Sequence, residues 1–317
     1  MKKLNIIILS ICLGISAVSC KKEKFEPETP SIAVQKQPID QLFEDYLDSK
    51  VQSFTVGANT ATTITGEQGT VITLSGSNFL DASGNPLTGN VTIDLVEIYF
   101  VKDMILTNKR TLAQTGTNQY EMLSSGGEFF INVTQNGAPV TIGTLLSVTT
   151  KSVFNPVWEM ELFSGSTNVR GDVTWNAFDT VTFVQDTISV AYNFPFDNSF
   201  NWINCDYFWS YPQPQTDVSI VTPSGCDNSN TKVFLAFTDE ESVASLNALN
   251  ENVFSTGSYY SLPEGLSLYV VVIKEENGQI SYAIEQTTIT TNHEVTIPGL
   301  LNVASMQELE TILESIL

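Results

Sequence analysis

Residues 91–95 read Val-Thr-Ile-Asp-Leu, and residues 129–134 read Phe-Phe-Ile-Asn-Val-Thr. In both stretches the residues alternate between two faces with period two, which is the pattern of a β-strand with one buried face. Turn-forming segments rich in Gly, Asn and Pro, at 125–127 and 136–139, follow such stretches or lie between them. Short strands with regular turns and no long helix between them predict a mainly β chain with two antiparallel β-sandwich-like domains.

The C-terminal half has the same pattern of short strands joined by turns. Residues 266–273 and 279–284 are two largely apolar segments joined by a turn that contains Asn277-Gly278. Asn-Gly suits the left-handed backbone positions of a tight hairpin turn. The runs 233–237 and 269–273 are apolar on both faces, so we expect them to be central strands that are covered on both sides.

A few short helices are expected beside the strands. Asp40 is a suitable N-cap for a helix that starts at residue 41, and Thr238 with Glu241 has the spacing of a capping box. Ser305 and Glu308 repeat that spacing before an amphipathic C-terminal helix. Its apolar face is expected to contain Met306, Leu309, Ile312, Leu313 and Ile316.

The N-terminus has the order of features of an export signal. Lys2 and Lys3 precede a mostly apolar run over residues 4–18, which is short for a membrane-spanning helix, and the segment ends with Ala-Val-Ser before Cys20. This ending resembles the lipobox of bacterial lipoproteins. The resemblance implies that Cys20 is lipidated and becomes the first residue of the mature chain, which would hold the body at a membrane of the bacterial cell envelope.

Four parts of the chain are expected from these patterns. They are a lipoprotein signal peptide (1–19), a disordered tether (20–40), a β-sandwich domain with a short N-terminal helix (41–150) and a second β-rich domain with short helices (151–317). The tether is rich in proline and charge and has few large apolar residues, so it cannot bury enough surface to order itself. We expect the lipid anchor to lie in the outer membrane. The sequence does not decide between the periplasmic face and the cell-surface face.

Composition excludes several classes of function. The chain of 317 residues has 35 Asp and Glu but only 14 Lys and Arg, a formal net charge of −21, which argues against a nucleic-acid partner because phosphate backbones demand positive charge. The single histidine, His293, rules out multi-histidine metal sites, and its polar neighbours favour a place at the surface. The sequence has no P-loop, no G-x-G-x-x-G after a strand and no nucleophile elbow, so no cofactor, metal or catalytic residue is predicted.

Carboxylates leave one enzymatic alternative open. Glycoside hydrolysis needs two carboxyl groups about 5–10 Å apart, a distance that a sequence cannot measure. Glu159 and Glu161 alternate with apolar residues and are expected on a solvated strand face. A carboxylate-dependent envelope glycan hydrolase is therefore the alternative to a non-catalytic binding or structural protein.

Cys205 and Cys226 are the cysteines of the body. An exported compartment permits their oxidation, and a disulfide that closes this loop would contribute about 3 kcal/mol in the chain-entropy model. Two reduced, buried thiols are the alternative, because cysteine count fixes no distance.

Aromatic residues are concentrated in one segment. Nine of the twenty residues from Tyr192 to Tyr211 are aromatic, against 10% of the whole chain. They either fill the core of the second domain or form an exposed surface that stacks on sugar rings or anchors a protein partner. The candidates for an exposed binding surface are Trp202, Tyr207, Trp209 and Tyr211.

Two parts of the body are similar to known sequences. The stretches 89–106 and 123–129, which contain Gly-Asn-Val-Thr-Ile-Asp-Leu and Leu-Ser-Ser-Gly-Gly-Glu-Phe, resemble β-rich envelope lipoproteins of the Bacteroidetes type, and so does 200–206 (Phe-Asn-Trp-Ile-Asn-Cys-Asp). The resemblance implies a shared β-rich architecture and supplies no activity and no site. A glycan or protein partner is expected for the body, without further identity.

Overall fold

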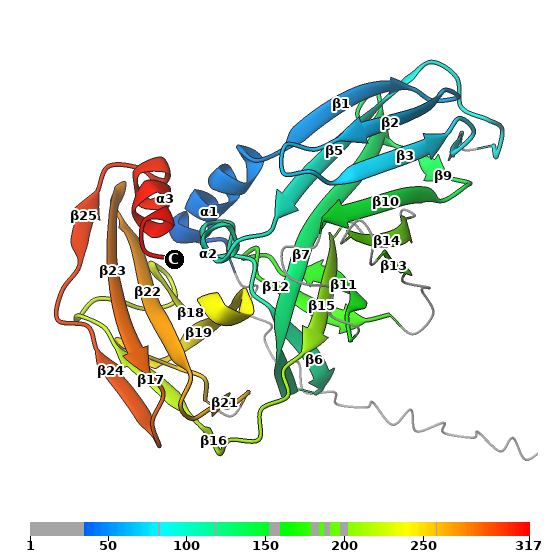
Figure 1. Ribbon diagram of the computed structural model, residues 1–317. Helices are drawn as coiled ribbons and strands as arrows, with labels where there is room; N and C mark the ends of the chain where they lie inside the picture. The colour runs from blue at the N-terminus through cyan, green and yellow to red at the C-terminus, as the bar shows by residue number, and fades with distance from the viewer. Residues whose placement is uncertain are drawn as a thin grey trace, which may run out of the picture. The chain divides into compact units, whose positions relative to one another are not determined.

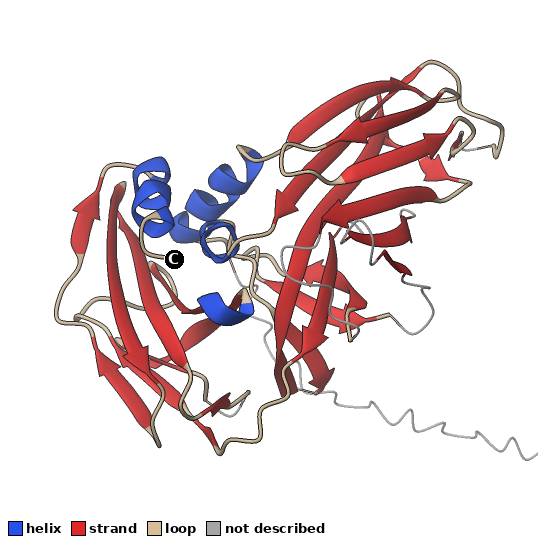
Figure 2. Ribbon diagram, viewed as in Figure 1, coloured by secondary structure: helices blue, strands red, loops and turns tan. Residues whose placement is uncertain are grey.

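A computed structural model describes residues 35–81, 83–117, 119–151, 159–178, 184–186, 191–196, 202–257 and 259–317. The predicted signal peptide, most of the predicted tether and Cys20 lie outside the described residues. Residues 34–317 form one compact unit that consists mainly of β-strands (Figures 1 and 2). No helix among the described residues is both long enough and apolar enough to cross a membrane.

The first eight-stranded sheet has the order β1-β5-β7-β15-β11-β12-β6, and β8 pairs with β7. Strand β7 is the longest of these, and β6 pairs with both β7 and β12, so the strands from β7 to β6 form a closed ring. The bounds are β1 (Gln52–Gly57), β5 (Asn90–Ile98), β6 (Leu112–Gly116), β7 (Gln119–Gln135), β8 (Ala138–Pro139), β11 (Glu161–Thr167), β12 (Val173–Ala177) and β15 (Trp202–Phe208).

A five-stranded sheet packs on one face of the first sheet. Its order is β13-β14-β10-β3-β2, with β2 (Ala61–Thr65), β3 (Val71–Ser75), β10 (Leu146–Lys151), β13 (Val184–Asp186) and β14 (Ala191–Phe196). A separate two-stranded pair consists of β4 (Phe79–Leu80) and β9 (Thr141–Ile142). Val91, Ile93 and Leu95 share a buried cluster with Ile72 and Val148, as the period-two pattern predicts. The predicted antiparallel sandwich is confirmed here.

The second eight-stranded sheet occupies the C-terminal third of the chain. Its order is β24-β17-β20-β19-β18-β22-β23-β25. A separate short pair joins β16, which comes before this sheet in the chain, to β21, which comes between β20 and β22. The bounds are β16 (Gln215–Thr216), β17 (Val218–Val221), β18 (Thr231–Phe237), β19 (Ser242–Asn250), β20 (Val253–Ser255), β21 (Leu262–Pro263), β22 (Ser267–Glu276), β23 (Gln279–Thr288), β24 (His293–Thr296) and β25 (Leu301–Val303).

The predicted hairpin and central strands of this sheet are confirmed. Strands β22 and β23 pair in register, and Asn277 and Gly278 between them both have positive φ, as a tight turn of this type requires. Every residue of β18 is buried, because alternate side chains enter two different apolar clusters. Val233 and Leu235 belong to one cluster, and Phe234 belongs to the other.

Three α-helices cover the sheets on the side of that second cluster. They are α1 (Pro38–Asp48), α2 (Val101–Leu106) and α3 (Met306–Glu314). Phe43 of α1 meets Phe234 with ring centroids 5.9 Å apart, and Leu309 of α3 lies in the same cluster as Trp175 of the first sheet. The C-terminal helix is confirmed, with Ser305 Oγ accepting the Glu308 N–H at 3.2 Å.

The predicted domain boundary at residue 150 does not separate the sheets. Strand β15 pairs with β7 along residues 123–130, and β11 pairs with β15, so residues 161–208 belong to the first sheet. The second sheet starts only after residue 216. The physical reason is that β7 is buried along most of its length, so its backbone N–H and C=O groups need a paired strand at both edges.

Two helix predictions also need correction. Helix α1 begins at Pro38 with Gln37 as its N-cap, and Asp40 is the third helical residue, whose carboxylate accepts the Gln37 N–H at 2.9 Å. The tether predicted to end at residue 40 therefore ends earlier. The segment after Thr238 forms one short 3₁₀ turn, η1 (Thr238–Glu240), because the chain must reverse at once to pair Phe237 with Ser242.

Candidate functional site

An aromatic groove lies between the start of β7 and two connections of the C-terminal third. It consists of two adjoining hollows of about 540 and 490 Å³ that share Tyr120, Glu121 and Ser261. These volumes are typical of ligand sites in proteins. The side chains that define the aromatic groove are those of Tyr120, Glu121, Trp209, Tyr211, Gln215, Asp217, Tyr259 and Ser261.

Backbone hydrogen bonds hold these separate segments together. The Trp209 N–H donates to the Met122 carbonyl at 3.1 Å, which attaches the segment after β15 to β7. The Tyr120 N–H donates to the Tyr259 carbonyl at 3.1 Å, which attaches the loop before β21 to the other side of β7. The groove is therefore built on the fixed end of a long strand, which is a rigid base for a binding site.

The aromatic rings at one end are fixed by edge-to-face packing. Trp209 meets Tyr211 with ring centroids 5.5 Å apart at 76° and Phe237 at 4.9 Å and 89°. The Tyr211 hydroxyl donates to Glu240, whose other carboxylate oxygen accepts the Ser124 hydroxyl at 2.7 Å. Partial burial and the Glu240 carboxylate both raise the pKa of Tyr211, so its hydroxyl keeps its proton. Little conformational entropy is left for these rings to lose on binding.

The groove combines ring surfaces with polar groups at its rim. Glu121, Gln215, Asp217 and Ser261 are exposed, and the Ser261 hydroxyl donates to Asp217 at 3.2 Å. Tyr259 is 42% exposed, and Trp209, Tyr211 and Tyr120 are half-buried. Aromatic rings beside hydroxyl, amide and carboxylate groups can stack on the C–H face of a sugar ring and bond its hydroxyls.

The candidate aromatic residues separate into two groups. Trp209 and Tyr211 line the groove, whereas Trp202 is only 6% exposed and packs against Phe130 at 5.4 Å, with the Lys109 ammonium 4.9 Å from its ring centre. The expectation that Trp202 is an exposed ring is therefore wrong. Its side chain lies on the face of the first sheet that the helices cover. Tyr207 is half-buried, and burial raises the pKa of its hydroxyl.

The two body cysteines are free and buried, so the disulfide alternative is wrong. Cys205 of β15 lies in the apolar cluster between the first sheet and the five-stranded sheet. Cys226 lies in the cluster of the second eight-stranded sheet. Two cysteines in separate cores cannot reach the short distance that a disulfide needs.

Buried carboxyl groups occur away from the groove. Glu128 and Asp206 are fully buried on β7 and β15, and both oxygens of Glu128 and one of Asp206 have no hydrogen-bond partner among the described residues. Burial raises the pKa of Glu128 to about 8 although the nearby Lys109 charge lowers it, and burial together with Glu128 raises that of Asp206. A substrate cannot reach side chains that are 0% exposed.

Neither the carboxylates of the groove nor the histidine forms a catalytic arrangement. Glu121 and Asp217 are both exposed at the rim of the groove and are not enclosed by apolar side chains. The expectation of a surface histidine is wrong, since His293 is only 9% exposed and its ring nitrogens meet the hydroxyls of Thr287 and Thr290 at 3.1 Å. Burial lowers the pKa of His293. Glu159 and Glu161 are both exposed, and Glu161 begins β11 as expected, whereas Glu159 lies in the turn before that strand.

Metal-binding groups are absent from the described part of the chain, in which no three His, Cys, Asp or Glu side chains gather. The acidic turns at Asp81 and Asp227 use their carboxylates locally. Asp81 accepts the N–H groups of Ser83 and Asn85 at 2.8 and 2.9 Å, and Asp227 accepts that of Ser229 at 2.7 Å. These are turns stabilised by their own side chains.

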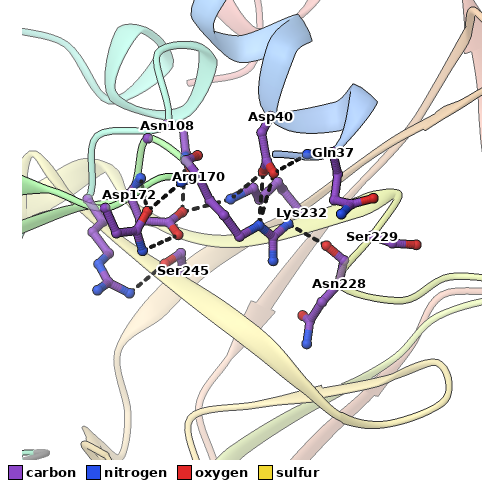
Figure 3. Close-up of polar contacts among 12 residues, drawn as sticks. Gln37, Asp40, Asn108, Arg170, Asp172, Asn228, Ser229, Lys232 and Ser245 are labelled. Carbon is purple, nitrogen blue, oxygen red and sulfur yellow. Dashed lines mark hydrogen bonds and ion pairs between the residues drawn. The ribbon is translucent and has the colours of Figure 1, made fainter. Parts of the chain in front are cut away.

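An ion-pair network connects α1 to both eight-stranded sheets (Figure 3). Asp40 has no exposed side-chain surface and accepts from Arg170 at 3.0 and 3.1 Å, and the Lys232 ammonium lies 3.4 Å away. Lys232 also bonds Asp172 at 2.7 Å. Burial opposes ionisation of Asp172, but Lys232 and Asn108 outweigh it and hold the pKa of Asp172 well below its usual value. We assign this network a structural role.

Sequence reasoning found one end of the groove and missed the rest. Tyr120, Glu121 and Asp217 belong to no local cluster of aromatic residues. The adjacent Tyr259-Tyr260 pair in a Ser-Tyr-Tyr-Ser loop is the one local signal that could have indicated the other end. No protein-family model matches this chain, and no curated protein is detectably similar to it in sequence.

Proposed function

We propose that this chain is a lipid-anchored protein of the bacterial cell envelope whose folded body binds an oligosaccharide in the aromatic groove without catalysing a reaction on it. The observation that carries the proposal is the groove itself, in which ring surfaces and hydrogen-bonding side chains line two adjoining hollows. Glycan binding uses this combination because sugar rings have apolar C–H faces and polar edges.

The lipid anchor is supported by the sequence around Cys20. The charged start, the apolar run and the small residues before Cys20 occur in the order that an acylated export signal requires. Several acyl chains on one cysteine hold a folded body at a bilayer, at about 0.8 kcal/mol for each buried methylene. The acidic composition would keep that body away from anionic lipid headgroups.

Replacing Cys20 with alanine should remove the protein from membrane fractions or leave its signal uncleaved. Fractionation of cells after metabolic labelling with a fatty acid measures both effects. Replacing Cys226 with alanine is the matched control, because this thiol is buried in the core and should carry no label. The Cys226 variant should therefore be labelled and fractionated like the wild type. Unchanged partitioning and acylation of the Cys20 variant would contradict the anchor.

Replacing Tyr259 or Tyr211 with alanine should weaken glycan binding about fivefold or more, because aromatic anchors commonly contribute above about 1 kcal/mol each. The assay is a glycan panel followed by calorimetry with the purified full-length protein in a mild detergent. Phe100→Ala is the control, since Phe100 is a 39% exposed aromatic outside the groove.

Failure of every glycan in the panel to bind would overturn the glycan proposal. Release of new reducing ends from a bound oligosaccharide would instead favour the hydrolase alternative. We expect no such release, because Glu121 and Asp217 of the groove are exposed to solvent. The buried carboxyl groups of Glu128 and Asp206 are out of reach of a substrate.

A further inference from the structure

Every charged side chain that lines the groove is negative. Glu121 and Asp217 face the two hollows, and no lysine or arginine is among the described lining residues. Glu240 adds a third carboxylate behind Tyr211.

The nearest cation is already occupied by protein groups. Arg110 lies 5.7 Å from the ring centre of Tyr120, but its guanidinium donates to the Val173 carbonyl at 3.0 Å and to the Ser245 hydroxyl at 3.2 Å. Its donors are held by protein acceptors, and its one positive charge is outnumbered by the carboxylates of Glu121 and Asp217 in the lining and Glu240 behind it. The whole chain has 35 acidic against 14 basic residues, so the surrounding field has the same sign as the groove.

Glu121 and Asp217 line the hollows, so a charged group on a ligand bound there would lie close to their carboxylates. Uronic-acid or sulfated sugars would place like charges beside Glu121 and Asp217. Sugars with a free amine would place an ammonium group there, and the carboxylates would accept its hydrogen bonds.

The shape of the groove indicates a chain of several sugars. The two hollows adjoin, because Tyr120, Glu121 and Ser261 line both of them, and each has further aromatic lining, with Trp209 and Tyr211 in one and Tyr259 in the other. Two stacking positions joined by a polar floor suit consecutive sugar rings of one oligosaccharide.

We infer that the groove selects oligosaccharides by charge, binding amine-bearing sugars most tightly, neutral sugars less tightly and acidic sugars weakest, with Glu121 and Asp217 as the residues that determine this order. This inference rests on the proposed glycan-binding function.

Three oligomers of equal length with a β-1,4-linked glucose-type backbone test it: one unmodified, one with amines at C2 and one with carboxylates at C6. At low ionic strength we expect the amine oligomer to bind the full-length protein about tenfold tighter than the neutral one and the acidic oligomer to bind weakest. In about 0.5 M NaCl the differences should shrink, because salt at this concentration screens exposed charges beyond a few ångströms.

The double variant Glu121→Gln with Asp217→Asn should bring the ratio of amine to acidic affinity close to one. Glu251→Gln with Glu285→Gln removes the same net charge from exposed positions that do not line the groove and should leave the ratio as it is. Equal affinities for the three oligomers, or a ratio that the groove variant does not change, would overturn the inference and leave glycan binding intact. Absence of binding by all three and by the wider glycan panel would overturn the proposed function instead.

Discussion

Replacing Asp40 with alanine should lower the free energy of unfolding by about 3–5 kcal/mol, because removal of one partner from a buried ion pair leaves the other charge uncompensated. The Asp40 carboxylate is 0% exposed and is the shared acceptor of Arg170 and Lys232. Without it, the two cations would have only Asp172 as an anionic partner within the network. The Gln37 N–H at the start of α1 would lose its acceptor as well.

Urea denaturation with linear extrapolation measures this loss. Asp45→Ala is the matched control on the same helix, because Asp45 is exposed and bonds only the Gln41 amide. It should change the stability by no more than about 0.5 kcal/mol. A double-mutant cycle with Lys232→Ala would give the coupling energy between the two residues. Equal effects of Asp40→Ala and Asp45→Ala would show that the network does not stabilise the fold.

Replacing Glu128 with glutamine should make the protein more stable than the wild type at pH 7, by an amount on the order of 3 kcal/mol, and should leave the two within about 1 kcal/mol of each other at pH 5. Glutamine preserves the shape of the side chain but cannot ionise. The wild-type carboxyl is fully buried and has no hydrogen-bond partner among the described residues, so its charged form is costly.

The direction of this change comes from the raised pKa. Burial places the pKa of Glu128 at about 8 in the folded protein, above its value in the unfolded chain. Its contribution to stability is therefore complete below about pH 4.5 and is lost as the pH rises through about 8. Lys109 titrates at the upper end of this pH range, because burial lowers its pKa to about 8. From there toward about pH 10.5 the unfolded chain binds more protons at Lys109 than the folded protein does, so the folded state gains stability as the pH rises.

Unfolding free energies measured between pH 5 and pH 7 test this result below the pH range in which Lys109 titrates. Glu241, whose pKa burial raises to about 7, and His293 are common to both proteins and cancel in the difference. Glu161→Gln is the control, as an exposed glutamate on β11, which β15 separates from β7. A difference between the Glu128 variant and the wild type that does not depend on pH would contradict a neutral Glu128 at low pH.

Local patterns predicted the parts of the fold that local forces determine. The alternation at residues 91–95, the Asn277-Gly278 turn and the cap at Ser305 each operate within a few residues, and the structure has the expected element at each place. The domain boundary failed because it depends on the pairing of β7 with β15, more than 70 residues further along the chain. No turn-rich segment marks that connection.

The candidate site was predictable only at its dense end. Clustering of aromatic residues in the sequence led to Trp209 and Tyr211, but alternation along β15 could not tell which face Trp202 would take. A register shift between Asn204 and Asp206 further changes the faces along that strand. Tyr120 and Tyr259 reach the groove through long-range pairing, which composition does not reveal.

The position of Asp40 has a mechanical consequence. A pull on the chain at its N-terminal side enters the described body at α1, whose first turn contains Asp40. Arg170 follows the first sheet's β11, and Lys232 belongs to β18 of the second, so tension is divided between the two sheets at the first turn. The first turn of the helix cannot separate from the sheets until both ionic contacts break, so these contacts resist a load that is applied there.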